Sequence, residues 1–362
     1  MTVALNTLFV TTEGAALFKD HETVVVKVEE KTRVQVPLLH LSGVVCLTRA
    51  YVSPDLLAAC SEAGIFVSFL SPTGRLLARI EGIPGGNVLL RRQQYRVADD
   101  AARSLLVARS MVIGKVANAR RFLANARRDA AAERQPLLAE AVDKLARHLA
   151  ALPDANSVES VRGLEGIAAR DYFAVFSLLL KVRTQSKRDS DGPGCAEDLE
   201  QPGAAAFVFN GRSRRPPRDR VNCLLSFGYA LLMQDCAGAA AGIGLDPAVG
   251  FLHEDRPGRL ALALDLMEEL RVPVVDRLTL ALINRGQLLA DDFVQDAGGG
   301  WKLTDDARKK VLVAYQEAKQ VEVRHPFLEQ NTMWGRVPHL QALLLARHLR
   351  GDLEVYPPFS IR

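Results

Sequence analysis

The hydrophobic pattern changes its period part-way along the chain, and this change constrains the fold more than any other feature. Up to residue 80, short β-branched or apolar runs are separated by turn residues such as Glu13-Gly14, which is typical of strands. A Gly/Pro-rich hexapeptide occupies residues 82–87, and helical patterns follow it to the C-terminus. The sequence therefore predicts an α+β protein. A small β-rich, β-sandwich-like domain covers residues 1–85, and a larger all-α domain covers residues 86–362.

Individual elements follow from the same patterns. In the first domain we expect strands at residues 5–11, 23–29, 33–37, 43–47 and 66–70, and a helix capped by Ser53 at residues 53–63. In the second domain we expect helices at residues 88–128, 131–152, 158–182, 219–242, 275–289, 304–321 and 335–350. The last seven residues are expected to form an extended, exposed arm that could dock on a partner.

Composition limits the class of protein. The five cysteines are widely spaced and form no CxxC pair, which argues against a disulfide framework and fits a reducing compartment. The N-terminus lacks the basic region and cleavage site of a signal peptide, and no apolar run suggests a bilayer span. We therefore expect a cytoplasmic protein without membrane attachment.

Positive charge is unevenly distributed, although the net charge is only +4. Residues 91–134 contain eleven Lys or Arg against four Asp or Glu, including the pair Arg120 and Arg121. The Gly/Pro-rich segment 185–220 ends with five arginines in nine residues, and we expect it to be a mobile loop. These segments indicate a surface for a polyanion, while ordinary solvated helices and a solvated linker are the alternatives.

The stretch from residue 250 to residue 276 combines a histidine with three acids. His253 lies in a charged turn, and Asp265, Glu268 and Glu269 follow on one face of a predicted helix. A histidine before a helix and carboxylates on that helix could converge on one divalent cation. Three solvated acids on a helix face are the alternative. Spacing alone does not decide which of the three would bind the ion.

Two further helices supply polar residues where apolar ones are expected. Glu165 falls in line with Tyr172 on the aromatic stripe of its helix, so its carboxylate points inward and needs a metal, a hydrogen-bond network or a partner such as Arg162. The neighbouring Gly163 and Gly166 suggest that another backbone approaches closely. On the apolar helix 219–242 a polar stripe faces either a site or a core network; it consists of Asn222, Ser226 and Tyr229.

Together these residues predict a class of chemistry. Two carboxylates and an imidazole suit Mn²⁺ or Mg²⁺ and leave positions for water and phosphate, whereas zinc usually takes thiolates or a second close histidine. Basic segments on both sides indicate phosphodiester chemistry on nucleic acid. No nucleophile elbow, Walker loop or dinucleotide fingerprint competes with this interpretation.

Three stretches resemble one known family, at residues 163–173, 222–232 and 245–278. The chain resembles the CRISPR-associated adaptation integrase, a metal-dependent DNA endonuclease that inserts new spacers. Residues 6–17 and 68–80 look like the N-terminal β domain of that family, so the likeness covers nearly the whole chain. One departure is Leu260-Ala261, where related sequences often have Pro-Ser; it removes no ligand.

The resemblance implies a metal site of Glu165, His253 and Glu268. Supporting residues would be Asp265, Asn222, Ser226, Tyr172 and Tyr229, and DNA-binding residues would be Arg256, Arg259, Arg120 and Arg121. It also implies a homodimer formed largely by the N-terminal domains. A small adaptation partner protein would bridge two such homodimers, and double-stranded DNA would be the substrate. The implied reaction is transesterification by the 3′-hydroxyl of an incoming DNA fragment. A non-catalytic DNA-binding scaffold and a branched-DNA repair nuclease are the alternative functions.

Overall fold

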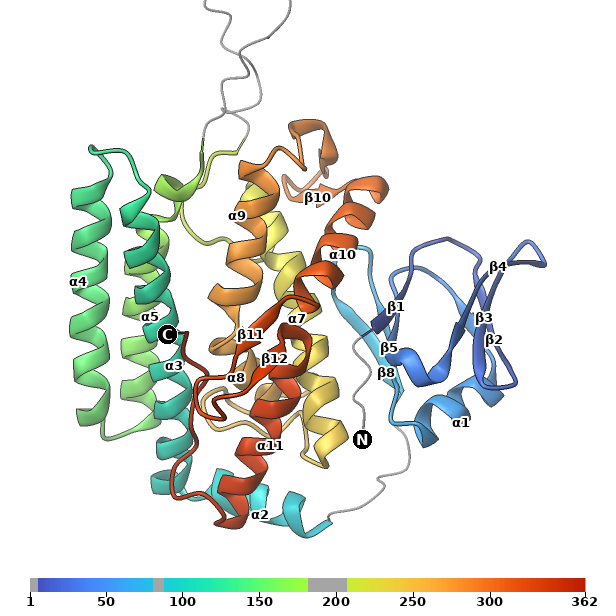
Figure 1. The fold of residues 1–362 in the computed structure, drawn as a ribbon, viewed down its shortest axis with the longest axis horizontal. Helices are drawn as coiled ribbons and strands as arrows, with labels where there is room; N and C mark the ends of the chain where they lie inside the picture. Colours follow the sequence, from blue (N-terminus) through green and yellow to red (C-terminus); the bar gives the residue numbers. More distant parts are fainter. Residues whose placement is uncertain (1–5, 81–87, 182–206, 362) are drawn as a thin grey trace, which may run out of the picture.

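The computed structural model describes residues 6–80, 88–181 and 207–361. A strand-rich part and a larger helical part lie side by side (Figure 1). The predicted boundary at residues 82–87 and most of the predicted loop 185–220 fall outside the described residues. The α+β class is confirmed, with strands first and helices after them.

The strand-rich part consists of two four-stranded sheets packed on each other. One sheet has the order β1-β5-β7-β8, with β1, β5 and β7 parallel and β8 antiparallel; the other has the order β4-β3-β2-β6. Apolar side chains from both sheets, such as Leu17 and Val44, are fully buried between them. The strands are β1 Asn6–Val10, β2 Ala16–Asp20, β3 Thr23–Val28, β4 Lys31–Pro37, β5 Leu41–Cys46, β6 Tyr51–Val52, β7 Phe66–Leu70 and β8 Leu76–Ile80.

Helix α1, Pro54–Glu62, covers the edge of this sandwich and begins as predicted. The Ser53 side chain accepts a hydrogen bond from the Leu56 amide, and Pro54 takes the first helical position, where its missing N–H costs nothing. Five of the eight strands match predicted runs. The remaining three, β2, β6 and β8, were missed.

The helical part contains nine α-helices among the described residues. They are α2 Val88–Asp99, α3 Ala101–Arg128, α4 Gln135–Ala151, α5 Val158–Ala174, α7 Arg220–Ile243, α8 Ala261–Glu268, α9 Arg277–Asn284, α10 Asp305–Lys319 and α11 Val337–Arg350. Residues 88–128, where we expected one long helix that could be broken or unbroken, form two helices. The chain breaks at Asp100, whose carboxylate caps α3 by accepting hydrogen bonds from the amides of Ala102 and Arg103.

Two short hairpins make this part mostly helical rather than all-α. They are β9 Phe293–Gln295 with β10 Trp301–Leu303, and β11 Glu322–Arg324 with β12 Asn331–Met333. The C-terminal residues, expected to form an exposed arm, are instead packed into the core. The side chains of Tyr356 and Phe359 are 1% and 0% exposed, and Phe359 lies between the rings of Trp334 and His325.

Helix α7 forms the centre of the molecule and joins its two parts (Figure 1). Its length and hydropathy would allow it to cross a membrane, but 67% of its most apolar window is buried inside the protein, as is usual for a core helix. Ser68 on β7 donates a hydrogen bond to Gln234 on α7, and a Cβ at Gly238 would lie 2.7 Å from the Phe66 ring. The sheet β1-β5-β7-β8 therefore packs directly on α7, and α8 and α11 also pack against α7.

Candidate metal centre

Helices α3, α5 and α8 bring the predicted ligands together. Lys115 of α3 forms ion pairs with Glu165 of α5 and with Glu268 of α8, and its Nζ lies 2.6 Å from Glu268 Oε2. His253, in the loop before α8, places its Nε2 3.8 Å from Glu268 Oε1. The two carboxylates thus share the ammonium group of Lys115, and the imidazole lies beside one of them.

Asp265 holds His253 in place. The Asp265 side chain is fully buried, and its two oxygens accept the amides of Phe251, Leu252 and His253 at 2.6, 2.9 and 3.0 Å. The His253 Nδ1 lies 2.7 Å from Asp265 Oδ1, and because a carboxylate only accepts hydrogen bonds, Nδ1 is the donor. The Nε2 atom is left facing Glu268.

The loop can wrap around Asp265 because residue 250 is glycine. A Cβ at Gly250 would lie 2.8 Å from Asp265 Oδ2 and 2.9 Å from Ala261 Cβ. The change to Leu260-Ala261 at the start of α8 leaves that helix without a side-chain cap. The carbonyl of Pro247 accepts the amides of Leu262 and Ala263 in its place, so α8 keeps a satisfied first turn.

Glu268 is a buried carboxylate with an unusually positive environment. Its side chain is 3% exposed, and Arg271 Nη2 lies 2.8 Å from Oε1. Burial acts to raise the pKa of Glu268, but the charges of Arg271, Lys115 and His253 outweigh it and lower that pKa to about 2. Oε2 is buried and accepts no well-directed hydrogen bond. An ionised, incompletely satisfied carboxylate oxygen of this kind is suited to bind a cation.

Glu269 belongs to a different environment, so the expectation that three acids share one face is wrong. Its fully buried carboxylate accepts hydrogen bonds from Tyr356 Oη, the Phe359 amide and Gln341 Nε2. Burial raises the pKa of Glu269 to about 7 despite these donors, which lower it. Helix α8 ends at Glu268. Sequence spacing did not distinguish Glu268 from Glu269, whereas the structure gives the two acids different partners.

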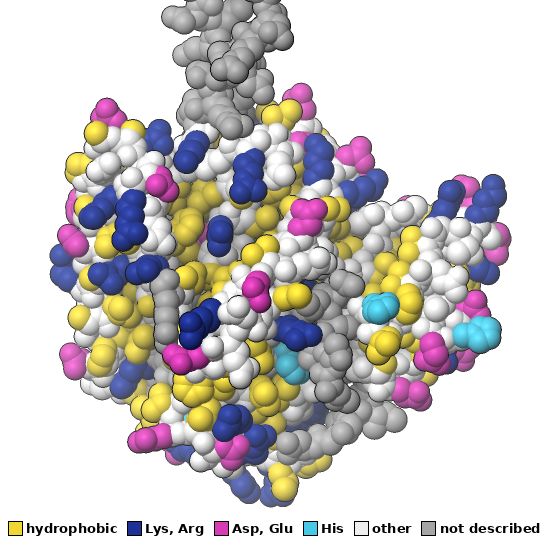
Figure 2. Space-filling model, in the orientation of Figure 1, with side chains coloured by type: hydrophobic (Ala, Val, Ile, Leu, Met, Phe, Trp, Pro, Cys, Tyr) yellow, Lys and Arg dark blue, Asp and Glu magenta, His cyan; other side chains and the backbone are white. Residues whose placement is uncertain are grey.

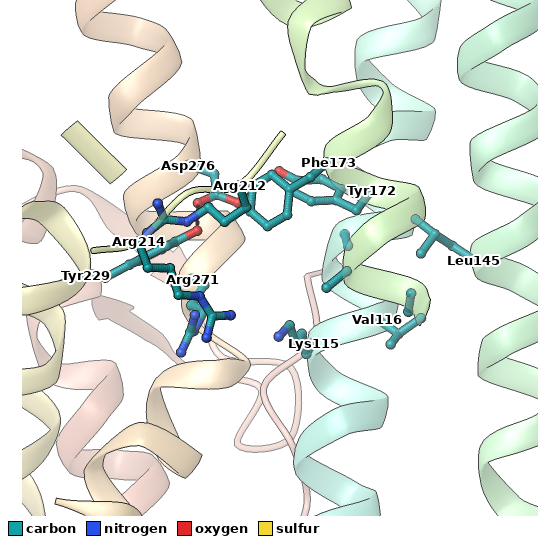
Figure 3. Close-up of a pocket in the computed structure, with 13 residues that line it drawn as sticks. Lys115, Val116, Leu145, Tyr172, Phe173, Arg212, Arg214, Tyr229, Arg271 and Asp276 are labelled. Atoms are coloured by element: carbon teal, nitrogen blue, oxygen red, sulfur yellow. Dashed lines mark hydrogen bonds between the residues drawn. The ribbon is translucent and has the colours of Figure 1, made fainter. Parts of the chain in front are cut away.

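Two of the predicted supporting residues, Tyr172 and Tyr229, line a cationic pocket beside this centre (Figure 3). Buried Asp276 accepts hydrogen bonds from the hydroxyls of Tyr172 and Tyr229, at 2.9 and 2.5 Å. Guanidinium groups lie on both sides of the Tyr229 ring, that of Arg271 at 4.9 Å and that of Arg212 at 5.3 Å. In Figure 3 the charged ends of Lys115, Arg214 and Arg271 point into the same space.

Asn222 and Ser226 reach this pocket only through Arg212. The Arg212 guanidinium donates hydrogen bonds to Asn222 Oδ1 at 2.6 Å and to Ser226 Oγ at 3.1 Å. Asn222 also binds the Gly211 carbonyl and Asp219, so it closes the chain onto the start of α7. Asn222 and Ser226 therefore anchor the basic segment after residue 206, whereas Tyr229 of the same stripe contacts Asp276.

Two details of α5 differ from expectation. Arg162 pairs with Glu254 at 3.1 Å and donates to the Leu252 carbonyl, so Lys115 and not Arg162 is the partner of Glu165. Within the part of the chain that the structure describes, nothing lies within 4 Å of a Cβ placed at Gly163 or Gly166, so the expected close approach of another backbone is not seen there.

The predicted DNA-binding arginines lie on the surface. Arg120 and Arg121 are exposed on α3, a turn and more beyond Lys115. Arg256 is exposed and pairs with Glu254, while Arg259 is half-buried and donates to the Glu254 carbonyl. Figure 2 shows Lys and Arg side chains spread over the helical part, with many in its upper half.

Sequence reasoning missed the residues that supply positive charge to the centre. Lys115, Arg212, Arg271 and the acid Asp276 are all buried or half-buried and all contact predicted site residues. The sequence did indicate that Lys115 is turned inward. It follows Met111 by four residues and precedes Asn118 by three, so it lies on the buried face of α3.

As they stand, no three acidic, imidazole or thiolate side chains within residues 6–80, 88–181 and 207–361 enclose a common metal position. The carboxylates of Glu165 and Glu268 instead form ion pairs, both with Lys115 and the latter also with Arg271. The assignment of Glu165, His253 and Glu268 as metal ligands thus stays a prediction.

Comparison with known proteins identifies the family. The family described as CRISPR associated protein Cas1 matches residues 8–317. The CRISPR-associated endonuclease Cas1 2 of Rhodospirillum rubrum is 48% identical over 98% of both chains. The CRISPR-associated endonuclease Cas1 1 of Chlorobaculum tepidum is 46% identical over 99% of both. The chain belongs to the Cas1 family. The predicted family and the predicted endonuclease function are confirmed.

Solved Cas1 structures share the fold. A CAS1 protein from Thermotoga maritima matches 99% of this chain and 100% of its own, with a TM-score of 0.78 and 21% identity. A casposase bound to an integration product matches 97% of this chain and 93% of its own, with a TM-score of 0.75 and 21% identity. The arrangement of a strand-rich part before a helical part is therefore that of Cas1.

Proposed function

We propose that this Cas1 chain is a metal-dependent DNA endonuclease and integrase that inserts DNA fragments as spacers into a CRISPR repeat array. The observation that carries the proposal is the meeting of the three predicted ligands in a chain of the Cas1 family: Lys115 Nζ pairs with both Glu165 and Glu268, and His253 Nε2 lies 3.8 Å from Glu268 Oε1. Two carboxylates that share a cationic partner form a site for a cation.

The residues present fit a divalent ion. Glu165, His253 and Glu268 would supply two carboxylates and one imidazole nitrogen, a donor set that suits Mn²⁺ or Mg²⁺. Glu268 Oε2 is buried and lies 2.6 Å from Lys115 Nζ without a well-directed hydrogen bond, so a divalent ion that displaced the lysine would bind this oxygen. When bound, the ion supplies Lewis-acid activation of a phosphate and lowers the pKa of an attacking hydroxyl.

The chain's own residues orient and neutralise the reacting groups. Asp265 fixes the His253 ring, with Nε2 turned toward Glu268. The cationic ends of Arg214, Arg271 and Lys115 face one pocket, where they would bind a phosphodiester of the DNA. In the transfer, the 3′-hydroxyl oxygen of the incoming fragment bonds to phosphorus, and the bond from that phosphorus to the 3′-oxygen of the repeat strand breaks. Water in place of the hydroxyl gives hydrolysis.

Further assignments complete the proposal. Double-stranded DNA would contact the exposed arginines at positions 120, 121 and 256, with Arg259 beside them. The strand-rich domain would form a homodimer, a small adaptation partner protein would bridge two dimers, and the complex would act in the cytoplasm. The fold likeness to a casposase bound to an integration product supports a strand-transfer reaction on this scaffold.

The test is half-site integration of a labelled DNA fragment into a repeat-bearing plasmid, with and without Mn²⁺ and the small partner. Glu165→Ala, His253→Ala and Glu268→Ala are each expected to abolish strand transfer while circular dichroism remains native. Glu254→Ala, in the same loop but exposed, is the matched control and should remain active. Strand transfer retained by any of the three variants removes that residue from the set. Binding without transfer by the wild type supports the scaffold alternative, and cleavage of branched DNA without integration supports the repair nuclease.

A further inference from the structure

The last residue of α8 and the residue after it face two different environments. Glu268 turns toward Lys115 and Arg271, whereas Glu269 turns toward the C-terminal segment, residues 356–361. The two residues are consecutive, so a shift of the Glu269 backbone displaces Glu268 as well. Whatever fixes Glu269 therefore also fixes the catalytic carboxylate.

The C-terminal segment supplies two of the donors that Glu269 needs. Tyr356 Oη and the Phe359 amide both donate to its carboxylate, and Gln341 Nε2 lies 3.2 Å from each oxygen. Glu269, Gln341 and Phe359 are fully buried. A buried carboxylate is stable only where such donors compensate its lost hydration, so Glu269 is bound tightly to this segment.

Asn118 joins the same segment to the helix that carries Lys115. Its Nδ2 donates to the carbonyls of Glu269 and Phe359, at 2.7 and 2.9 Å, and its Oδ1 accepts the Ile361 amide at 2.7 Å. Asn118 is fully buried and lies one helical turn after Lys115 on α3. One amide side chain thus ties α3, the end of α8 and the C-terminal segment together.

The C-terminal segment packs closely against α3 and the end of α8. A Cβ at Gly114 of α3 would lie 2.9 Å from Pro358 Cβ and 3.2 Å from Glu269 Cβ. Phe359 is held between Trp334 and His325, with ring centroids at 5.2 and 5.5 Å. The segment is therefore anchored by Phe359 and packs against two of the three helices of the metal centre, α3 and the end of α8.

We propose that residues 356–361 are a positioning element of the catalytic site, which holds Glu268 and Lys115 at a fixed separation through Glu269 and Asn118. The inference rests on the proposed function of Glu268. Tyr356, Glu269 and Asn118 act as positioning residues, because none of them contacts the three predicted ligands with its side chain. The segment acts on catalysis by restricting where the carboxylate can lie.

The test compares Tyr356→Phe with the wild type. This substitution removes one donor to Glu269 and keeps the buried ring. We expect kcat for strand transfer to fall roughly tenfold or more, with KM for DNA unchanged, and Mn²⁺ alone to bind more weakly by calorimetry. Truncation after Ser360, which removes the Ile361 amide from Asn118, is the second variant and should lower kcat in the same way.

Two controls separate positioning from stability. Val355→Ala changes an exposed residue immediately before the segment, and Leu56→Ala destabilises the distant strand-rich core. Both should keep wild-type kcat well below their melting temperatures. Wild-type kcat and Mn²⁺ affinity in folded Tyr356→Phe and in the truncated chain would overturn the inference, whatever their melting temperatures. Glu268→Ala in the same assay distinguishes failure of the proposed metal site from failure of the positioning inference. If Glu268→Ala retains strand transfer, the proposed site is wrong. If Glu268→Ala is inactive while Tyr356→Phe and the truncated chain are fully active, only the positioning inference is wrong.

Discussion

The imidazole of His253 and the carboxylate of Asp265 lie 2.7 Å apart, from Nδ1 to Oδ1, and the same carboxylate accepts the backbone amide of His253 at 3.0 Å. One acid therefore fixes both the loop and the ring that it carries. This leaves Asp265 without a free oxygen for an ion and gives it an orienting role.

Asp265→Asn tests that role. The amide can accept at one oxygen only, so it loses part of the hydrogen bonding to residues 251–253 and no longer enforces the Nδ1–H form of the ring. We expect strand transfer to fall by roughly 10- to 100-fold. Glu254→Gln, in the same loop and exposed, should stay close to wild type. Equal activity of Asp265→Asn and Glu254→Gln would show that Asp265 does not orient the ring.

Glycine-to-alanine changes on α5 and on α3 should change the free energy of unfolding in opposite directions. Alanine at Gly163 or Gly166 meets open space and removes a helix-interior glycine, so each should stabilise by roughly 1 kcal/mol. Alanine at Gly114 meets Pro358 and Glu269 and should destabilise, by about 1 to 3 kcal/mol. Urea unfolding midpoints measure the difference. A stabilising Gly114→Ala would contradict the close packing of the C-terminal segment on α3.

Asp276 should make stability depend on pH in a defined direction. Burial raises its pKa from the ordinary 3.8 to about 6, although hydrogen bonds from Tyr229 and Tyr172 lower it. The folded protein therefore holds this proton more tightly than the unfolded chain. The contribution is fully present below about pH 4 and is lost as pH rises through about 6, a difference of roughly 3 kcal/mol.

Asp276→Asn removes this titration. The free energy of unfolding of the wild type, relative to the variant, should fall as the pH is raised from about 4 to 7. Urea unfolding at several pH values gives both curves. A difference that stays constant over this range would mean that Asp276 does not titrate there.

DNA binding should depend steeply on salt if the exposed arginines contact phosphates. Replacing Arg120 and Arg121 together by Gln should weaken binding and reduce the slope of log affinity against log salt by up to about 2. Lys144→Gln, a half-exposed cation of α4 that already pairs with Glu140, is the control and should change the slope little. An unchanged slope in the arginine variant would place the DNA elsewhere.

Periodicity and caps predicted most of the fold. The change of period predicted strands first and helices after them, and Ser53 and Thr304 correctly marked the starts of α1 and α10. Strands β2 and β8 were missed because they are short and carry charged residues. The C-terminal segment was misjudged because its two prolines suggest an extended, solvated arm, whereas Tyr356 and Phe359 fill space that only the tertiary structure creates.

The site was predictable only in part. Glu165, His253 and Glu268 could be nominated from the inward stripe of one helix, the loop before another and the family pattern. The family pattern named Asp265 only as a supporting acid, and the partners of Asp265 and Glu269 could not be predicted. Each is decided by another segment, the amides of residues 251–253 in one case and Tyr356 in the other. Lys115 was overlooked since a lone lysine on a basic helix is usually solvated.

Anomalous diffraction from crystals soaked in Mn²⁺ shows whether Glu165, His253 and Glu268 form one metal site. We expect a manganese peak in contact with all three side chains, and its loss in crystals of Glu268→Ala. A manganese peak bound elsewhere, in protein that carries out Mn²⁺-dependent strand transfer, would contradict it.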